Sequence, residues 1–190
     1  MLKVSILVGN PKLNSRTLRV AETVVEKLLV EGSYDVSVID LAGHSAQIFD
    51  WPSEHMAALN ETVASSNLLV VASPTYKATY TGLLKAFLDR YPHNGLRGVT
   101  AIPVMTGADS THSMGVDVNL RPLLIELGAS VPTKGLYFIA SQMDQLDEIV
   151  GAWAMENAAV LRLLQPLVEG VLSRHLPAEA VAASAKGAGA

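Results

Sequence analysis

The sequence predicts an α/β protein in which a five-stranded parallel sheet is covered by helices on both faces. Three observations support this fold class. Short apolar runs alternate along the chain with longer segments of helical periodicity. Most of these runs are almost continuously apolar, as strands buried on both faces are. The chain has 190 residues, 49% of them hydrophobic, which is enough for one domain with a large core.

The strands are expected at five short segments: residues 4–8, 34–40, 68–72, 99–105 and 136–139. The first reads VSILV and the third LLVVA, both without a polar interruption longer than one residue. The second, YDVSVID, alternates and follows a turn at residues 31–33. Pro74 should end the third strand, because proline cannot donate a hydrogen bond to the sheet.

Helical patterns fill the intervals between these strands. They cover residues 15–30, 53–63, 82–91, 115–127 and 146–168. Ser53 is expected to cap the second of these helices, since it precedes apolar residues at helical spacing. Pro122 lies inside the fourth and removes the amide that would bond to the carbonyl of Val118. A local irregularity is therefore expected in that helix.

Right-handed crossovers between parallel strands leave few topologies for five strands. At this size we expect the flavodoxin-like three-layer sandwich, with strand order 2-1-3-4-5. Residues 1–172 should form this single domain, while the small residues of the segment 173–190 indicate a disordered or loosely ordered tail. Sheets of this kind bind ligands at the carboxyl ends of their strands. The loops after the first, third and fourth strands are therefore the candidate sites.

Composition excludes several classes of function. A net charge of −4 argues against nucleic acid as a partner, and no apolar run approaches the roughly 20 residues that span a bilayer. The chain lacks cysteine, a signal-peptide pattern, paired histidines at metal-ligand spacing and the G-x-S-x-G motif of hydrolases. We therefore expect a cytoplasmic protein without a metal site and without a membrane-bound segment.

The first loop, GNPKLNSRT at residues 9–17, is rich in donors but lacks the glycine motifs of nucleotide-binding loops. Asn10, Ser15, Arg16 and Thr17 are its candidate ligand-binding residues. A helix N-terminus already favours an anion, and the hydroxyls and guanidinium could surround a phosphate. The alternative is that Asn14 or Ser15 only caps the helix and Arg16 is solvated.

The second loop, SPTYKATYTG at residues 73–82, could form a wall for a flat aromatic ligand. Alternatively, Tyr76 and Tyr80 pack beneath the loop as ordinary core residues. In the third loop, Thr106, Gly107 and Ala108 can offer backbone groups to the polar edge of a ring. His112 is either a solvated histidine or a proton-transfer group.

Three segments resemble the NAD(P)H-dependent FMN reductase family, and in particular its branch that supplies reduced flavin to alkanesulfonate monooxygenases. They are SRTL at 15–18, VASPTYKATYTGLLKAFLD at 71–89, and the loop that leads into VDVNLRPLL at 116–124. The resemblance implies FMN and either NADPH or NADH as cofactors. It places Ser15, Arg16 and Thr17 at the FMN phosphate. It places Pro74, Thr75, Tyr76 and Lys77 beside the flavin, and Thr106, Gly107 and Ala108 at its pyrimidine edge.

Two positions depart from the family pattern. Many relatives have glycine where this chain has Ala108, and relatives in the sulfonate branch often have an aromatic or imidazole side chain at Val118. In some of them that residue belongs to a π-helical bulge at the oligomer interface. A flavin-transfer mechanism that depends on such a side chain is therefore not expected here.

The resulting hypothesis is an FMN reductase that transfers a hydride from a nicotinamide nucleotide, needs no catalytic side chain, and serves a flavin-dependent monooxygenase. A flavoprotein that keeps FMN and reduces quinones or azo compounds is one alternative. A flavodoxin-type electron carrier is another, as is a scaffold protein that has lost flavin. Apolar helices beyond what one small sheet covers indicate a homodimer or homotetramer.

Overall fold

The computed structural model describes the backbone of residues 1–175 and the side chains of residues 1–161. Its five parallel strands lie in the order β2-β1-β3-β4-β5, which confirms the predicted fold class and strand order. In the register of the sheet, Val4 pairs with Val36 on one side and with Leu68 on the other. The strands are β1 Leu2–Val8, β2 Tyr34–Asp40, β3 Leu68–Pro74, β4 Thr100–Gly107 and β5 Leu136–Ile139.

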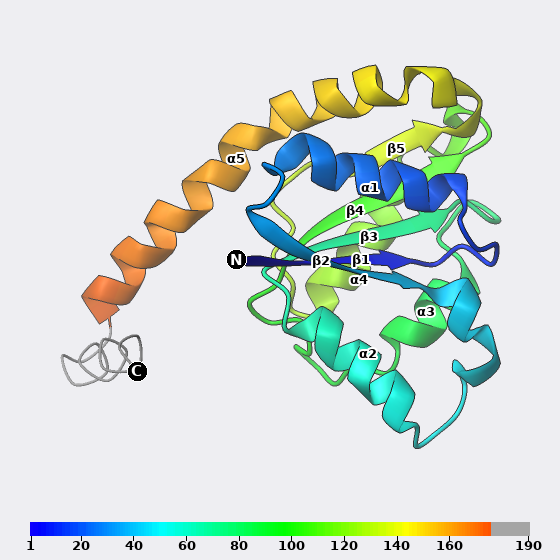
Figure 1. Cartoon of the computed structure of the whole chain (residues 1–190), viewed down its shortest axis with the longest axis horizontal. Helices are drawn as coiled ribbons and strands as arrows, with labels where there is room; N and C mark the ends of the chain where they lie inside the picture. Colours follow the sequence, from blue (N-terminus) through cyan, green and yellow to red (C-terminus); the bar gives the residue numbers. More distant parts are fainter. Residues whose placement is uncertain (176–190) are drawn as a thin grey trace.

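Helices cover both faces of the sheet, as Figure 1 shows. Helices α1 (Arg16–Leu28) and α5 (Leu146–His175) lie on one face, and α2 (Glu54–Ala64), α3 (Gly82–Leu88) and α4 (Arg121–Glu126) on the other. Each face has its own cluster of buried side chains, and all seven residues of the central strand β3 are buried. The predicted single domain at 1–172 stays a prediction, and residues 176–190 of the expected tail lie outside the described residues.

Hydroxyl side chains determine where three of the helices begin. Ser53 Oγ accepts a hydrogen bond from the amide of Met56 at 3.3 Å, which confirms the predicted cap of α2. Ser15 Oγ accepts from the amide of Leu18 at 3.2 Å and caps α1. Thr81 caps α3 in the same way, with the amide of Leu84 at 3.1 Å. Each cap satisfies an amide that would otherwise lack a partner within the helix.

The helix expected over residues 115–127 is divided into a π-helix, η3 (Val116–Leu120), and α4. The amide of Arg121 bonds to the carbonyl of Val116, five residues earlier. Pro122 follows directly and has no amide to offer. The predicted irregularity is therefore confirmed, and its form is a single turn of π-helix.

A histidine pair joins the short 3-10 helix η1 (Leu41–Gln47) to α2: Nε2 of His55 in α2 lies 2.9 Å from Nδ1 of His44 in η1. Partial burial lowers the pKa of His44, the charge of His55 lowers it further, and Asp40 opposes both. The unfolded chain therefore takes up a proton on His44 at a higher pH than the folded protein does. We expect the thermal midpoint to fall as the pH drops below about 6.5, the ordinary histidine pKa. The fall should be smaller in His44→Gln, and parallel pH profiles for parent and variant would contradict this account.

Within residues 1–175, no helix is both long and apolar enough to cross a membrane. Among residues 1–161, whose side chains the structure describes, no three histidine, aspartate or glutamate side chains gather in a way that could hold a metal ion.

Candidate functional site

A cavity of about 600 Å³ lies at the carboxyl edge of the sheet, toward which the strand arrows in Figure 1 point. We call it the carboxyl-edge cavity. It is formed by the loops after β1, β3 and β4 together with the segment after β5. The lining residues are Asn10, Lys12, Asn14, Ser15, Arg16, Thr17, Pro74, Thr75, Tyr76, Thr106, Gly107, Ala108, Ala140 and Ser141. Ten of the eleven residues predicted for the site are among them; the exception is Lys77.

The loop after β1 brings positive charge and the N-terminus of α1 to the cavity. Arg16 stands at the first turn of α1, and its Nη1 donates to the carbonyl of Ala140 at 2.9 Å, so the guanidinium reaches from α1 to the end of β5. The amide of Asn14, whose φ is 51°, donates to Asp40 Oδ2 at 3.1 Å. This bond fixes the loop just before the helix begins. The N-terminus of α1 and the Arg16 side chain therefore favour an anion in this part of the cavity.

Thr106 joins the three loops at the floor of the cavity. Its hydroxyl lies 2.8 Å from Thr17 Oγ1, and its carbonyl accepts from the amide of Thr75 at 2.7 Å. Asn10 Nδ2 also donates to Thr17 Oγ1, at 3.1 Å. Thr17 is 1% exposed, so its hydroxyl holds two loops together while it lines the cavity. Its contact with a phosphate stays a prediction.

The loop after β3 forms a tight turn beside the cavity. Tyr76 and Thr79 exchange backbone hydrogen bonds of 2.9 and 3.3 Å, and Lys77 occupies the exposed tip between them. Tyr76 is 52% exposed and lines the cavity, whereas Tyr80 packs against the core. The core interpretation thus holds for Tyr80 only. Thr75 Oγ1 is buried and finds no hydrogen-bond partner within the described residues, as expected of a group that a polar ligand would satisfy.

The loop after β4 is held by a residue that the sequence did not single out, Tyr137 of β5. Its hydroxyl donates to the carbonyl of Asp109 at 3.0 Å. A Cβ atom on Gly107 would lie only 1.7 Å from that hydroxyl, so this close packing requires glycine. Asp109 caps the short helix η2 (Ser110–His112) by accepting from the amide of Thr111 at 2.8 Å. The Thr111 side chain and, after it, this backbone amide lower the pKa of the Asp109 carboxyl.

His112 is exposed and does not line the cavity. The structure thus places it as an exposed histidine at the end of η2, outside the lining of the cavity. None of the side chains that line the cavity is a histidine, aspartate or glutamate. The cavity is therefore suited to binding and orienting a ligand rather than to acid–base catalysis by its own carboxylates or imidazoles.

Sequence reasoning missed four lining residues: Lys12, Asn14, Ala140 and Ser141. A signal for the last two was available, because β5 runs parallel to β4 and its carboxyl end must reach the same edge of the sheet. The cavity as a whole combines the cationic side chains of Lys12 and Arg16 and the N-terminus of α1 with a wall at residues 106–108 that offers backbone groups. That combination fits an elongated ligand with an anionic group and a flat polar ring.

Comparisons with known proteins point to one family. Residues 2–144 match the family model described as NADPH-dependent FMN reductase. FMN reductase (NADPH) of Escherichia coli K12 is 31% identical over 144 residues, 75% of this chain and 75% of that protein. NADH-dependent FMN reductase SfnF of Pseudomonas putida is 30% identical over 151 residues, 76% of this chain and 81% of its own. Among solved structures, the apo form of an NADH:FMN oxidoreductase superposes with a TM-score of 0.72 at 27% identity, covering 82% of this chain and 90% of that one.

Proposed function

Because this chain belongs to the NADPH-dependent FMN reductase family, we propose that its carboxyl-edge cavity binds FMN with the phosphate at the loop after β1. The protein is an oxidoreductase that uses FMN and a nicotinamide nucleotide. The main observation in support of this binding mode is that the Arg16 side chain and the N-terminus of α1 lie in the same wall of the cavity, where both favour an anion. The proposed FMN-binding residues are Asn10, Ser15, Arg16, Thr17, Pro74, Thr75, Tyr76, Lys77, Thr106, Gly107 and Ala108.

The donor set fits a phosphate monoester. The first amides of α1 point out of the helix, and the capping bond of Ser15 uses its oxygen as an acceptor, so its hydroxyl proton remains free to donate. Arg16 adds a guanidinium, and Lys12, also in the lining, adds a second cation. A dianionic group is stabilised by charge-assisted bonds of this kind more than by neutral donors. The uncharged wall at 74–76 offers no comparable site for the phosphate.

The remaining walls fit a ring with polar edges. Pro74, Thr75 and Tyr76 line one side, and the backbone of Thr106, Gly107 and Ala108 lines another. The unpartnered Thr75 hydroxyl can donate to or accept from a ring substituent or the polar chain that links ring and phosphate. Lys77 lies outside the cavity lining, so we assign it a role at the mouth, through charge rather than direct packing.

When bound, FMN supplies the capacity to accept a hydride from a nicotinamide nucleotide. The residues of this chain have to bind FMN, orient it and shield it from water. Thr106 holds the loops at a fixed separation through its bonds to Thr17 and Thr75, and Tyr137 fixes the 106–109 loop through Asp109. The backbone amides of this loop are then positioned before binding, where they can stabilise negative charge on the polar edge of a ring.

We further propose that FMN is an exchangeable substrate and that the reduced form serves a flavin-dependent monooxygenase. The supporting observation is the openness of the walls: Lys12, Arg16 and Tyr76 are all exposed at the cavity. The resemblance to the sulfonate branch of the family supports the same conclusion.

Steady-state kinetics with purified protein test this proposal. We expect a colourless protein that oxidises NADPH or NADH when FMN is added as the varied substrate, with saturation in FMN. A yellow protein that turns over with quinones or azo dyes but shows no dependence on added FMN would instead indicate a retained prosthetic group. The absence of oxidation with either nicotinamide nucleotide would exclude the reductase itself.

We also propose that the protein forms a homodimer or homotetramer. The supporting observation is a set of exposed apolar side chains on η3, on α4 and two residues before η3: Val118, Ile125 and Met114 are 55%, 54% and 69% exposed. Burying such side chains against a second copy would be favourable. Sedimentation velocity at micromolar concentration should therefore show a species larger than 20.1 kDa, and a monomer would contradict the proposal.

A further inference from the structure

We propose that Asn119 of the π-helix η3 is a positioning residue for the flavin site: it holds the strained turn at residues 76–79, whose first residue forms a wall of the carboxyl-edge cavity. The inference deepens the proposed function and rests on it. Asn119 does not line the cavity, and nothing in the reaction requires it to touch FMN. Its effect would pass through the turn alone.

The turn is strained at two adjacent residues. Lys77 and Ala78 have φ values of 52° and 68°, although neither is glycine or asparagine. Two-residue turns with both central φ values positive are normally built from Asn-Gly or similar pairs, because a Cβ atom disfavours this conformation. Such strain persists only where surrounding contacts hold it. A contact from outside the turn is therefore expected to hold Lys77 and Ala78 in this conformation.

The π-helix provides that contact. Asn119 Nδ2 donates to the carbonyl of Ala78 at 3.1 Å. Beside it, Gly115 approaches so closely that a Cβ atom there would lie 3.3 Å from the same carbonyl oxygen. The carbonyl of Ala78 is thus bonded by the Asn119 side chain and packed against the backbone of Gly115 at the start of the same π-helix.

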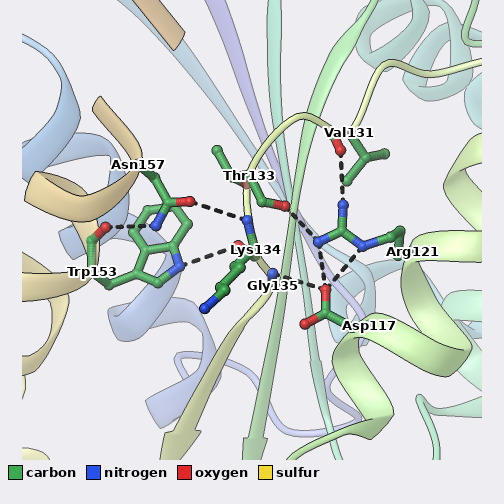
Figure 2. Close-up of polar contacts among 8 residues, drawn as sticks. All are labelled: Asp117, Arg121, Val131, Thr133, Lys134, Gly135, Trp153 and Asn157. Atoms are coloured by element: carbon green, nitrogen blue, oxygen red, sulfur yellow. Dashed lines mark hydrogen bonds and ion pairs between the residues drawn. The ribbon is translucent and has the colours of Figure 1, made fainter. Parts of the chain in front are cut away.

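Asp117 of the π-helix and the adjacent Arg121 are bonded to the segment that precedes β5, as Figure 2 shows. Asp117 Oδ1 accepts from Arg121 Nε at 2.9 Å and from the amide of Gly135 at 3.0 Å. Arg121 Nη1 also donates to the carbonyl of Val131 at 2.8 Å. This network fixes the element from which Asn119 extends.

The same network continues to α5. Asn157 Oδ1 accepts from the amide of Lys134 at 3.1 Å, and Trp153 Nε1 donates to the carbonyl of Lys134 at 3.2 Å. The π-helix is therefore braced against two further elements while Asn119 meets the turn. If the bond to Ala78 is lost, the braced helix stays in place and the strained turn is free to relax. Tyr76, at the base of the turn, would then shift and alter the cavity wall.

Binding measurements on three variants test this inference. Asn119→Ala should raise the Kd for FMN roughly three- to tenfold, the effect of one lost hydrogen bond. Ala78→Gly keeps the carbonyl but removes the Cβ that makes the turn strained. In the double variant it should therefore bring the Kd back to within about twofold of the parent. Asn157→Ala is the matched control, because it breaks bonds at the far end of the network. It should lower the thermal midpoint and leave the Kd unchanged.

The outcomes separate this inference from the proposed function. If the parent binds and reduces FMN but Asn119→Ala binds it equally well, the inference is wrong and the function stands. If Ala78→Gly fails to restore binding, the Asn119 effect does not pass through turn strain, and the inference is again wrong. If Asn157→Ala weakens FMN as much as Asn119→Ala does, general destabilisation explains both. A parent that neither binds nor reduces FMN would overturn the inference together with the proposed function.

Discussion

Replacing Arg16 with alanine should weaken FMN binding by roughly 10- to 100-fold and leave riboflavin binding within about twofold of the parent. The first range corresponds to the loss of hydrogen bonds between a charged donor and a charged acceptor. Riboflavin has no phosphate, so the guanidinium has nothing equivalent to bind. Titration of parent and variant with both ligands, followed by flavin fluorescence, measures the difference.

Arg19 offers a matched control on the same helix. Its guanidinium pairs with Glu22 and Glu26 at 3.8 and 3.6 Å, and it does not line the cavity. Arg19→Ala should therefore change neither Kd. Added salt should weaken FMN binding to the parent more than to Arg16→Ala, because screening acts on the charge pair. Equal weakening of FMN and riboflavin by Arg16→Ala would mean that the phosphate lies elsewhere.

Gly107→Ala should lower the free energy of unfolding by about 1–3 kcal/mol, the range for overpacking a filled site, and weaken FMN binding at the same time. The new Cβ would lie 1.7 Å from Tyr137 Oη and 2.6 Å from its Cζ. Either the tyrosine leaves and releases Asp109, or β4 moves. Both responses displace the 106–108 backbone that lines the cavity. Denaturant unfolding and FMN titration measure the two effects.

Gly82→Ala is the control for this substitution. Gly82 is the last residue of the second loop and the first of α3, but a Cβ there would meet nothing within 4 Å. Alanine at that position should leave stability unchanged or slightly raised. Adding Tyr137→Leu, which removes the clashing atoms, should recover part of the stability lost in Gly107→Ala. If Gly107→Ala is as harmless as Gly82→Ala, the close packing against Tyr137 is not a constraint on the site.

Local pattern was sufficient to predict the strands, the Ser53 cap and the interruption before Pro122, since each depends on residues within one turn or one strand. It did not predict the turn at 76–79. Lys-Ala lacks the Asn-Gly signal of such turns, and the contact that holds it comes from Asn119, 41 residues later. The place of Lys77 beside the flavin was implied by the family resemblance and stays a prediction; the tight turn places Lys77 at its exposed tip.

The candidate site was predictable as a set of loops but not as a set of bonds. Parallel strands must bring their carboxyl ends to one edge, so the three loops could be identified from spacing alone. The bond between Thr17 and Thr106 joins residues 89 positions apart, and no local pattern indicates it. No local pattern indicates the packing of Tyr137 against Gly107 either, because it depends on the register of β4 against β5.

The structure of the FMN complex tests the central claim most directly. We predict that the phosphate lies within hydrogen-bond distance of Arg16 and the first amides of α1. The flavin ring should lie between the residues at 74–76 and the backbone of Thr106, Gly107 and Ala108. A phosphate bound away from the α1 N-terminus, or a flavin outside the carboxyl-edge cavity, would contradict the account.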